Sequence, residues 1–598
     1  MAHTPAGGEA LHLSARRLRI GVAVALVLLL ILGMRLLFVQ GVDAAGHAQK
    51  AMDERLRSVS ITPDRGSILD REGRVLASSV QRYDLVVDQR LVTEEYKLWN
   101  RETNRQDVVH LDDALGELAP ILSMEPQELR QRLVGDRPYR VVLRGVTPEV
   151  KNQAMDVRVP GLLAKPVADR SYPNGAVAGN ILGFISDDGR PLEGLEVSQD
   201  HQLAGTPGKR TYEIGADGIR IPNAEFSETP AVDGKDVRLT IDQDVQWFAQ
   251  EAIATKTDSY NAAWGNIVVQ DLKTGEILAL ADSTTVDPTD PSKTDSLFWR
   301  PTALTQSYEP GSTGKVATFA TALEEGGVQP LDEYTVPNKQ EFDGQIINDS
   351  LPHDTYDMTT AGIFTRSYNT GTVQVANSVD TDTRYEYLRR LGIGQPIDIG
   401  LPGANQGILA PPEQWDGRQK FTTMFGQGYT LTTLHTSQVF QAVANGGVLV
   451  PPKLIDAYVD PDGSEHQVET GEPTRIFSEQ TSREMIKMME GVVQEGTGGA
   501  AKIPGYRVGG KTGTGQAAGA GGYDGHTTSF TAVAPLDDPR FVVSVAVHRP
   551  EGFWRDWQVT DTAGQVMAYL LNKYNVPPTD AEPQHYDVFT DEPQKRPW

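Results

Sequence analysis

One apolar segment near the start of the chain limits what the rest can be. Residues 20–39 are apolar apart from two glycines and Arg35. A helix of twenty residues is about 30 Å long, which matches the hydrocarbon core of a bilayer. Arg35 stands near the end of the segment, where its side chain can reach the lipid headgroups. We therefore predict one transmembrane helix over 20–39, with the remainder of the chain folded in water.

The charges around this segment predict its orientation. Arg16, Arg17 and Arg19 precede it and Asp43 follows it. Because basic residues are retained on the cytoplasmic side, residues 1–19 should form a cytoplasmic tail. The chain after the helix should then lie outside the cell membrane as a single-pass protein. The first fifteen residues are small and polar, so we expect disorder there.

A cleaved signal peptide is the alternative to an anchor. Residues 42–44 loosely resemble the small-x-small pattern of a cleavage site. The apolar stretch is long for a signal peptide, so we favour an uncleaved anchor.

Length and composition exclude several classes of protein. With 598 residues the chain should hold two to four domains, and 39% hydrophobic and 23% charged residues indicate a folded protein. The net charge of −25 argues against nucleic-acid binding. The chain has no cysteine, which excludes disulfides, thiol catalysis and Cys-ligated zinc. Four histidines show no metal-ligand spacing, and we expect no metal or cofactor: His353, His435, His526 and His548.

A connector that contains Pro230 and Gly234, at residues 228–235, divides the part outside the membrane. Before it we predict a mixed N-terminal module over 40–230, and after it a domain over 231–577. Strands and helices gathered around one sheet predict an α+β domain, not a doubly wound one. Residues 578–598 are read as a disordered C-terminal tail. The expected strands of the second domain are 236–241, 265–271, 275–280, 506–514, 528–534 and 541–548.

Three short motifs in the second domain carry chemistry. In the first, Ser312 lies at the start of a helix predicted over 315–325, and Lys315 lies on the same face. The helix dipole favours an oxyanion near Ser312. Desolvation of Lys315 would favour its neutral form, which can take the proton of Ser312. Alone, the pair is more often a helix cap and a solvated lysine.

The second motif contains Ser367 and Asn369 and follows a helix predicted over 359–365. A serine there can relay a proton between Lys315 and a leaving amine, and an asparagine can donate to a substrate amide. Alone, the motif would be read as a polar turn.

The third motif is Lys511, Thr512, Gly513 and Thr514. On a strand edge, Lys and Thr can bind a carboxylate, while Gly513 lets a substrate backbone approach. The N–H groups of Thr514 and Ser312 can form an oxyanion hole. Alone, the motif is a glycine-rich loop, and a second Lys-Thr-Gly at 273–275 is read as a hairpin turn.

The order of the motifs changes their weight. The second lies 55 residues after the first (367 − 312) and the third 142 residues after the second (511 − 369). A nucleophile with a base, a second proton-handling group and a carboxylate-binding strand together indicate a serine acyltransferase that reacts with penicillin. Residues 515–525, rich in Gly and Ala, are predicted to form a mobile loop at the rim of the cleft.

With these motifs the chain resembles the class B penicillin-binding proteins, which are peptidoglycan D,D-transpeptidases. The resemblance covers nearly the whole chain after residue 16. It rests on residues 65–73, 170–173, 182–184, 194–196, 203–208, 308–315 and 426–428. It implies a penicillin-binding transpeptidase domain with an antiparallel sheet flanked by helices. An elongated N-terminal module, of the dimerisation or pedestal kind, would precede that domain.

The resemblance also implies roles. Ser312 would be the acylated residue, Lys315 its base, and the other two motifs the rest of the catalytic site. The pattern is most similar to the septal, FtsI-type enzymes of actinobacteria, with an elongation-type enzyme as the alternative. Gly314 replaces a bulkier residue and Tyr368 a small one, and both changes bear on β-lactam affinity more than on the reaction class.

The partners implied are peptidoglycan stem peptides with their lipid-linked precursor, β-lactams bound covalently at Ser312, a membrane-embedded glycosyltransferase and other divisome proteins. Two other functions stay open. A β-lactam sensor or scaffold would lack turnover. A β-lactamase would need a water-activating group, and no convincing Glu-x-x-x-Asn lies between the second and third motifs.

Overall fold

The computed structural model describes residues 8–38, 52, 55–100, 104–186, 188–214, 221, 226–519, 522–552 and 559–590. The chain divides into two compact units. The first comprises Met1–Pro63 and Gly205–Asp233, and the second comprises Asp64–Ala204 and Gly234–Trp598. The domain boundaries expected at residues 230 and 577 stay predictions.

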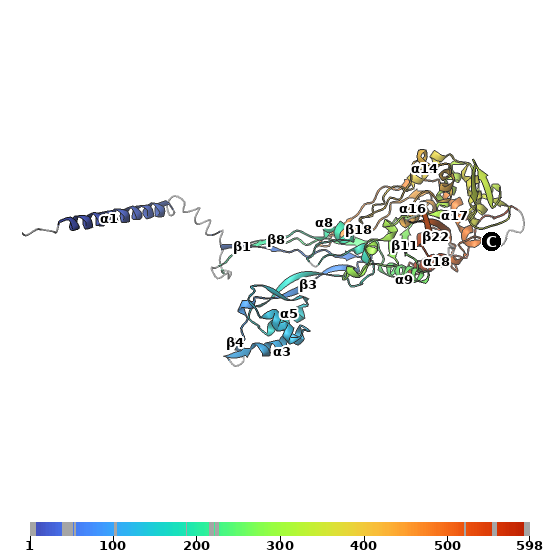
Figure 1. Cartoon of the computed structure of the whole chain (residues 1–598). Coiled ribbons are helices and arrows are strands. Elements are labelled where there is room, and N and C mark those ends of the chain that lie inside the picture. The colour runs from blue at the N-terminus through green and yellow to red at the C-terminus, as the bar shows by residue number, and fades with distance from the viewer. Residues whose placement is uncertain are drawn as a thin grey trace, which may run out of the picture. The chain divides into compact units, whose positions relative to one another are not determined.

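The first unit contains an apolar helix and a small sheet (Figure 1). Helix α1 (Gly8–Leu37) holds the one described segment that is long and apolar enough to cross a membrane, Arg16–Leu37. The helix begins at Gly8, so the expectation of disorder is wrong from that residue onward. The last residue of the predicted span, Val39, lies outside the described residues.

The sheet of the first unit is antiparallel. Strand β8 (Gly208–Glu213) lies between β1 (Leu56–Ile61) and β9 (Phe226–Thr229). The side chains of β9 are all exposed, so this sheet buries little apolar surface on that strand.

The second unit begins with a small layered subdomain. Strand β3 (Val75–Val87) pairs with β6 (Arg140–Val146) and β7 (Leu162–Ser171). Its apolar side chains share one core with those of α3 (Leu111–Ile121). The same sheet continues through β2 (Ile68–Leu69), β10 (Asp236–Leu239) and β18 (Ile455–Val459) to β19 (Glu465–Gln467). Strands from both sides of the connector therefore form one sheet.

Buried ion pairs hold this junction together. Arg65 Nε donates to Glu196 Oε2 over 2.7 Å, and Arg170 Nε donates to Glu196 Oε1 over 2.7 Å. Arg65 also bonds to Asp200, and Arg170 Nη1 donates to the carbonyl of Gly66 over 2.8 Å. The Glu196 side chain is fully buried. The segments 65–73, 170–173 and 194–196, on which the resemblance partly rests, are therefore joined through the carboxylate of Glu196.

A five-stranded antiparallel sheet forms the centre of the larger domain. Its spatial order is β12 (Ile277–Asp282), β11 (Trp264–Asp271), β23 (Phe541–His548), β22 (Gly522–Ala534) and β21 (Gly509–Gly519). Alternate side chains point to opposite faces, and both faces are covered, so the strands are nearly continuous apolar runs.

Helices cover both faces of the sheet. Helices α9 (Gln243–Ser259) and α18 (Thr560–Lys573) contact one face, and α16 (Thr433–Ala444) and α17 (Glu479–Gln494) the other (Figure 1). Each face has its own apolar cluster. Helix α11 (Lys315–Glu325) packs on α16 and α17. The predicted α+β architecture is confirmed.

Two expectations about flexible segments are wrong. The described residues of 515–525 belong to a hairpin, because β21 and β22 pair as far as Ala518 with Tyr523 and Gly519 with Gly522. In the C-terminal tail, Val588 and Phe589 are buried in the main apolar cluster, 3% and 1% exposed. Local composition predicted a mobile loop at 515–525 and disorder at 578–598. Hairpin pairing replaces the loop, packing against distant residues orders the tail near Val588, and residues 591–598 lie outside the described residues.

Candidate active site

The nucleophile segment is a 3-10 turn, Gly311–Gly314, that leads into α11. Ser312 is partly exposed, whereas the side chain of Lys315 is fully buried. Gly311 has a φ of +54°, and a Cβ there would lie 2.3 Å from the carbonyl oxygen of Thr514. Only glycine fits this close approach, which places the first motif directly against the third.

Lys315 reaches the second motif. Its Nζ donates to Ser367 O over 2.6 Å, to Ser367 Oγ over 3.3 Å and to Asn369 Oδ1 over 2.8 Å. Ser367 ends α12 (Thr360–Arg366) with a φ of +65°, which is uncommon for a residue with a side chain. Asn369 begins α13 (Asn369–Ala376). The turn between the two helices thus aims both motif side chains at Lys315.

The third motif reaches the same hydroxyl from the other side. Lys511 is fully buried in β21, and its Nζ donates to Ser367 Oγ over 2.9 Å. Ser367 Oγ therefore lies between two lysine nitrogens. Thr512 Oγ1 shares a hydrogen bond of 2.6 Å with Thr497 Oγ1, which fixes its side chain.

Gly513 and Thr514 complete the third motif. A Cβ on Gly513 would lie 2.6 Å from the carbonyl oxygen of Pro310, so the strand can approach the nucleophile segment only because this residue is glycine. Thr514 is the one residue of the four that is partly exposed. Strand β21 is the last strand of its sheet. All eight residues predicted from the sequence are thus brought to one place by the contacts among the three motifs.

Glu309 is a residue that the sequence reading missed. Its Oε1 accepts from the N–H of Gly428 over 2.9 Å, and Gly311 N donates to Gly426 O over 2.8 Å. Burial raises the pKa of the Glu309 carboxyl, while hydrogen bonding from Gly428 opposes that shift. Glu309 thereby ties the loop at 426–428 to the nucleophile segment. Its position directly before Pro310-Gly311, at the start of the nucleophile segment, was the one feature of the sequence that could have singled it out.

Asp349 was also missed, and His353, read from the sequence only as no metal ligand, is its partner. Asp349 accepts from the backbone N–H groups of Asn369 and Thr370, the second over 3.2 Å, and from Thr370 Oγ1 over 2.8 Å. It therefore caps α13, although it lies twenty residues earlier in the chain. His353 Nε2 lies 3.0 Å from Asp349 Oδ2. Among the described residues no cluster of three His, Cys, Asp or Glu could hold a metal ion.

The space left by Gly314 is filled. A Cβ there would lie 2.4 Å from the hydroxyl of Tyr429 and 3.0 Å from Cα of Gly426. Tyr429 is 2% exposed and belongs to the main apolar cluster. The position where a bulkier residue was expected is therefore occupied by the packed hydroxyl of Tyr429.

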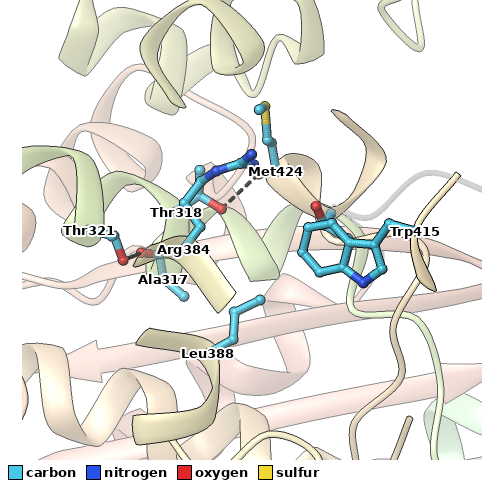
Figure 2. A pocket seen from close by; sticks show the side chains of 8 residues that line it. Ala317, Thr318, Thr321, Arg384, Leu388, Trp415 and Met424 are labelled. Carbon is cyan, nitrogen blue, oxygen red and sulfur yellow. Dashed lines mark hydrogen bonds between the residues drawn. The ribbon is translucent and has the colours of Figure 1, made fainter. Parts of the chain in front are cut away.

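A small cavity behind the nucleophile helix is a separate feature (Figure 2). It is lined by residues of α11 together with Arg384, Trp415 and Met424, and a hydrogen bond of 2.8 Å joins Thr318 Oγ1 to Met424 O. Burial lowers the pKa of Arg384 to about 10. None of the eight motif residues lines this cavity, so we do not assign the reaction to it.

Comparison with known proteins agrees with this geometry. Residues 265–568 match the family model of the penicillin binding protein transpeptidase domain. Residues 60–239 match the family model of the penicillin-binding protein dimerisation domain. The penicillin-binding protein PbpB of Mycolicibacterium smegmatis is 34% identical over 591 residues, covering 94% of this chain and 91% of the relative. The chain belongs to the penicillin-binding protein transpeptidase family.

Further members of the family extend the match. The peptidoglycan D,D-transpeptidase FtsI of Escherichia coli is 28% identical over 531 residues, with 88% of this chain and 86% of the relative covered. Penicillin-binding protein 3 of Mycobacterium tuberculosis, solved in complex with aztreonam, superimposes with a TM-score of 0.68 at 28% identity. That match covers 88% of this chain and 99% of the solved one. The predicted family and fold are confirmed.

Proposed function

We propose that this penicillin-binding protein is a peptidoglycan D,D-transpeptidase that works through an acyl-serine at Ser312. The main support for this proposal is the position of Ser367 Oγ, which lies 3.3 Å from Lys315 Nζ and 2.9 Å from Lys511 Nζ. This arrangement provides a buried proton path beside a partly exposed serine. Relatives that are named peptidoglycan D,D-transpeptidases support the reaction class.

In the acylation step, Ser312 Oγ attacks the penultimate D-Ala carbonyl carbon of a stem peptide. Its proton passes to Lys315, whose amine must be neutral to accept it. The carbonyl π electrons move to oxygen and form a tetrahedral oxyanion. Collapse of that oxyanion breaks the amide bond, and the departing D-Ala nitrogen takes a proton relayed through Ser367 Oγ. An amine from a neighbouring stem then attacks the acyl carbon and gives up a proton to Lys315, and breakage of the bond to Ser312 Oγ returns that proton to the serine.

The oxyanion and the substrate carboxylate need donors. We assign the oxyanion to the N–H groups of Ser312 and Thr514, since the contact of Gly311 with Thr514 brings these two segments together. The partly exposed Thr514 side chain and the charge of Lys511 would hold the terminal carboxylate. The edge position of β21 allows a peptide to add beside it as a strand. No metal or cofactor enters these steps.

The cellular setting is part of the proposal. The apolar helix Arg16–Leu37 fits a single-pass anchor, and the basic residues before it favour a catalytic domain outside the cytoplasm. The names of the FtsI and PbpB relatives favour a septal role over an elongation role. The N-terminal module would then dock a membrane-embedded glycosyltransferase and other divisome proteins.

A fluorescent penicillin tests the chemistry. The full chain in detergent should form one covalent adduct per molecule, and Ser312→Ala should form none. An adduct on Ser312→Ala would refute the assignment of the nucleophile. Slow loss of the adduct supports a transpeptidase, whereas rapid turnover would indicate a β-lactamase. Release of D-Ala from a stem peptide with joining of an acceptor amine separates an enzyme from a sensor.

A further inference from the structure

The C-terminal segment 586–590 runs beside the second motif. Strand β16 (Tyr356–Thr359) lies next to it: Thr359 N donates to Val588 O over 3.2 Å, and Thr590 N donates to Asp357 O over 3.1 Å. Met358 and Phe589 form an antiparallel bridge. The segment therefore covers an edge of β16, directly before α12 begins.

The same segment is pressed against α12. A Cβ on Gly362 would lie 1.9 Å from Val588 O, so the helix and the segment touch backbone to backbone. Thr359 Oγ1 accepts from Gly362 N over 2.8 Å as the helix cap and donates to Asp587 O over 2.6 Å. The start of α12 is thus fixed by the C-terminal segment as well as by its own cap.

Aromatic rings connect Phe589 to the second motif. Phe589 meets Tyr356 edge to face with ring centres 5.5 Å apart, and Tyr356 stacks on His353 at 5.5 Å. His353 stacks on Tyr368 at 4.0 Å. The guanidinium of Arg366 lies 5.6 Å from the centre of the Phe589 ring. Such contacts have preferred geometries, so they constrain orientation as well as burial.

Arg366 and Tyr368 flank Ser367 in the chain. Ser367 has a φ of +65°, and a side-chain-bearing residue keeps such a conformation only when its surroundings hold it there. Both neighbours are held by contacts that lead to Phe589, one directly and the other through two rings. This turn sets the place of Ser367 Oγ between the two lysines.

We propose that residues 586–590 brace the second motif and that Phe589 is a positioning residue for acylation. The inference rests on the proposed acyl-serine function. It assigns no contact with substrate to Phe589, which is 1% exposed. It predicts that loss of the ring slows the chemical step and leaves the initial binding of penicillin unchanged.

The test uses the full chain in detergent and a fluorescent penicillin, with Phe589→Ala, Phe589→Leu and a control. The control Tyr586→Phe removes one hydroxyl from the same segment, where it bonds to Glu484 on α17 and not to the second motif. Phe589→Leu keeps an apolar side chain in the cluster and removes the ring. Rates are measured below the Tm of every variant, so that a change in stability alone does not alter them.

We expect the acylation rate constant to fall about tenfold in Phe589→Leu and more in Phe589→Ala, because a misplaced catalytic group costs up to about a hundredfold. The dissociation constant of the non-covalent complex and the rate of Tyr586→Phe should stay at the wild-type values. Wild-type acylation by a folded Phe589→Leu would overturn the inference. If Phe589→Ala does not fold, Phe589→Leu alone decides. Failure of the wild-type chain to form any adduct would refute the proposed function instead.

Discussion

Two buried clusters of charge in this protein are built on opposite principles. At the junction of the N-terminal module, Arg65 and Arg170 share the carboxylate of Glu196. At the active site, Lys315 and Lys511 both donate to the hydroxyl of Ser367, and they also donate to Asn369 Oδ1 and Thr512 O, respectively. A buried carboxylate shared by two guanidinium groups holds its segments together, whereas a hydroxyl between two amines can accept and donate a proton. The first cluster suits a joint and the second suits catalysis.

The largest effect should follow from removing the catalytic lysine. Lys315→Met replaces a buried amine with an apolar side chain of similar length, and acylation by a fluorescent penicillin should slow about a thousandfold or more. The Tm should stay within a few degrees, because an apolar replacement carries no buried charge. A variant that keeps a tenth of the wild-type rate would show that Lys315 is not the base.

The joint should respond in the opposite way. Glu196→Gln leaves Arg65 and Arg170 facing a neutral amide, which should lower the free energy of unfolding by about 3–5 kcal/mol. Acylation per folded molecule should not change. Glu228→Gln is the matched control, since Glu228 pairs with Arg210 at the surface, where solvent screens the pair, and its loss should leave the Tm nearly unchanged. If Glu196→Gln and Glu228→Gln lowered the Tm equally, the buried Glu196 cluster would not be the stabilising joint described above.

The shared hydroxyl should have an intermediate effect. Ser367→Ala removes the group between the two lysine nitrogens, so acylation should decrease about a hundredfold through loss of proton relay. Ser378→Ala is a suitable control, because Ser378 Oγ donates only locally, to Val375 O over 2.8 Å. An unchanged acylation rate in Ser367→Ala would remove the serine from the proton path.

The smallest effect concerns pH. Both ring nitrogens of His353 face acceptors, Asp349 Oδ2 at 3.0 Å and Asp354 O at 2.6 Å, which suits the protonated ring. Burial lowers the pKa of His353, but the bonds to Asp349 and Asp354 outweigh burial and raise it above its ordinary value of 6.5. The protonated His353 ring therefore stabilises the folded state fully below pH 6.5, and this contribution is lost as pH rises through the higher pKa that His353 has in the folded state.

Thermal unfolding across that range should show a decrease in Tm on the order of 2 °C as pH rises, and His353→Gln should abolish this part of the pH dependence. Tyr356 and Tyr368 stack on the ring, and the guanidinium of Arg366 interacts with both, so the Arg366 charge acts on the same profile. A profile that is identical in His353→Gln would show that the pair with Asp349 does not titrate in this range.

The sequence predicted best what depends on neighbouring residues. The helix after Ser312 and the turn after α12 follow from breakers, caps and spacing within a few residues, and both occur where expected. The three motifs could be joined because their order along the chain is informative. Their contacts, by contrast, depend on close backbone approaches such as Gly311 to Thr514, which no local pattern contains.

The failures have a common physical cause. Asp349 caps a helix twenty residues away, and His353 contacts Asp349 and Tyr368. Metal-ligand spacing, which was the only test applied to His353 in the sequence, does not detect such contacts. Residues 515–519 are poor strand formers by composition, yet pairing with β22 holds them extended. Phe589 is buried and holds the C-terminal segment against the domain, although the composition of that segment predicted disorder. Strand pairing or packing overrides local propensity in each case.

The contact of Gly314 with Tyr429 limits which side chains can stand beside the nucleophile. A Cβ at position 314 would lie 2.4 Å from the Tyr429 hydroxyl and 3.0 Å from Cα of Gly426, and the Tyr429 ring is buried. A larger residue at 314 therefore requires the ring to move or position 429 to become smaller, so the sizes of the two residues are linked.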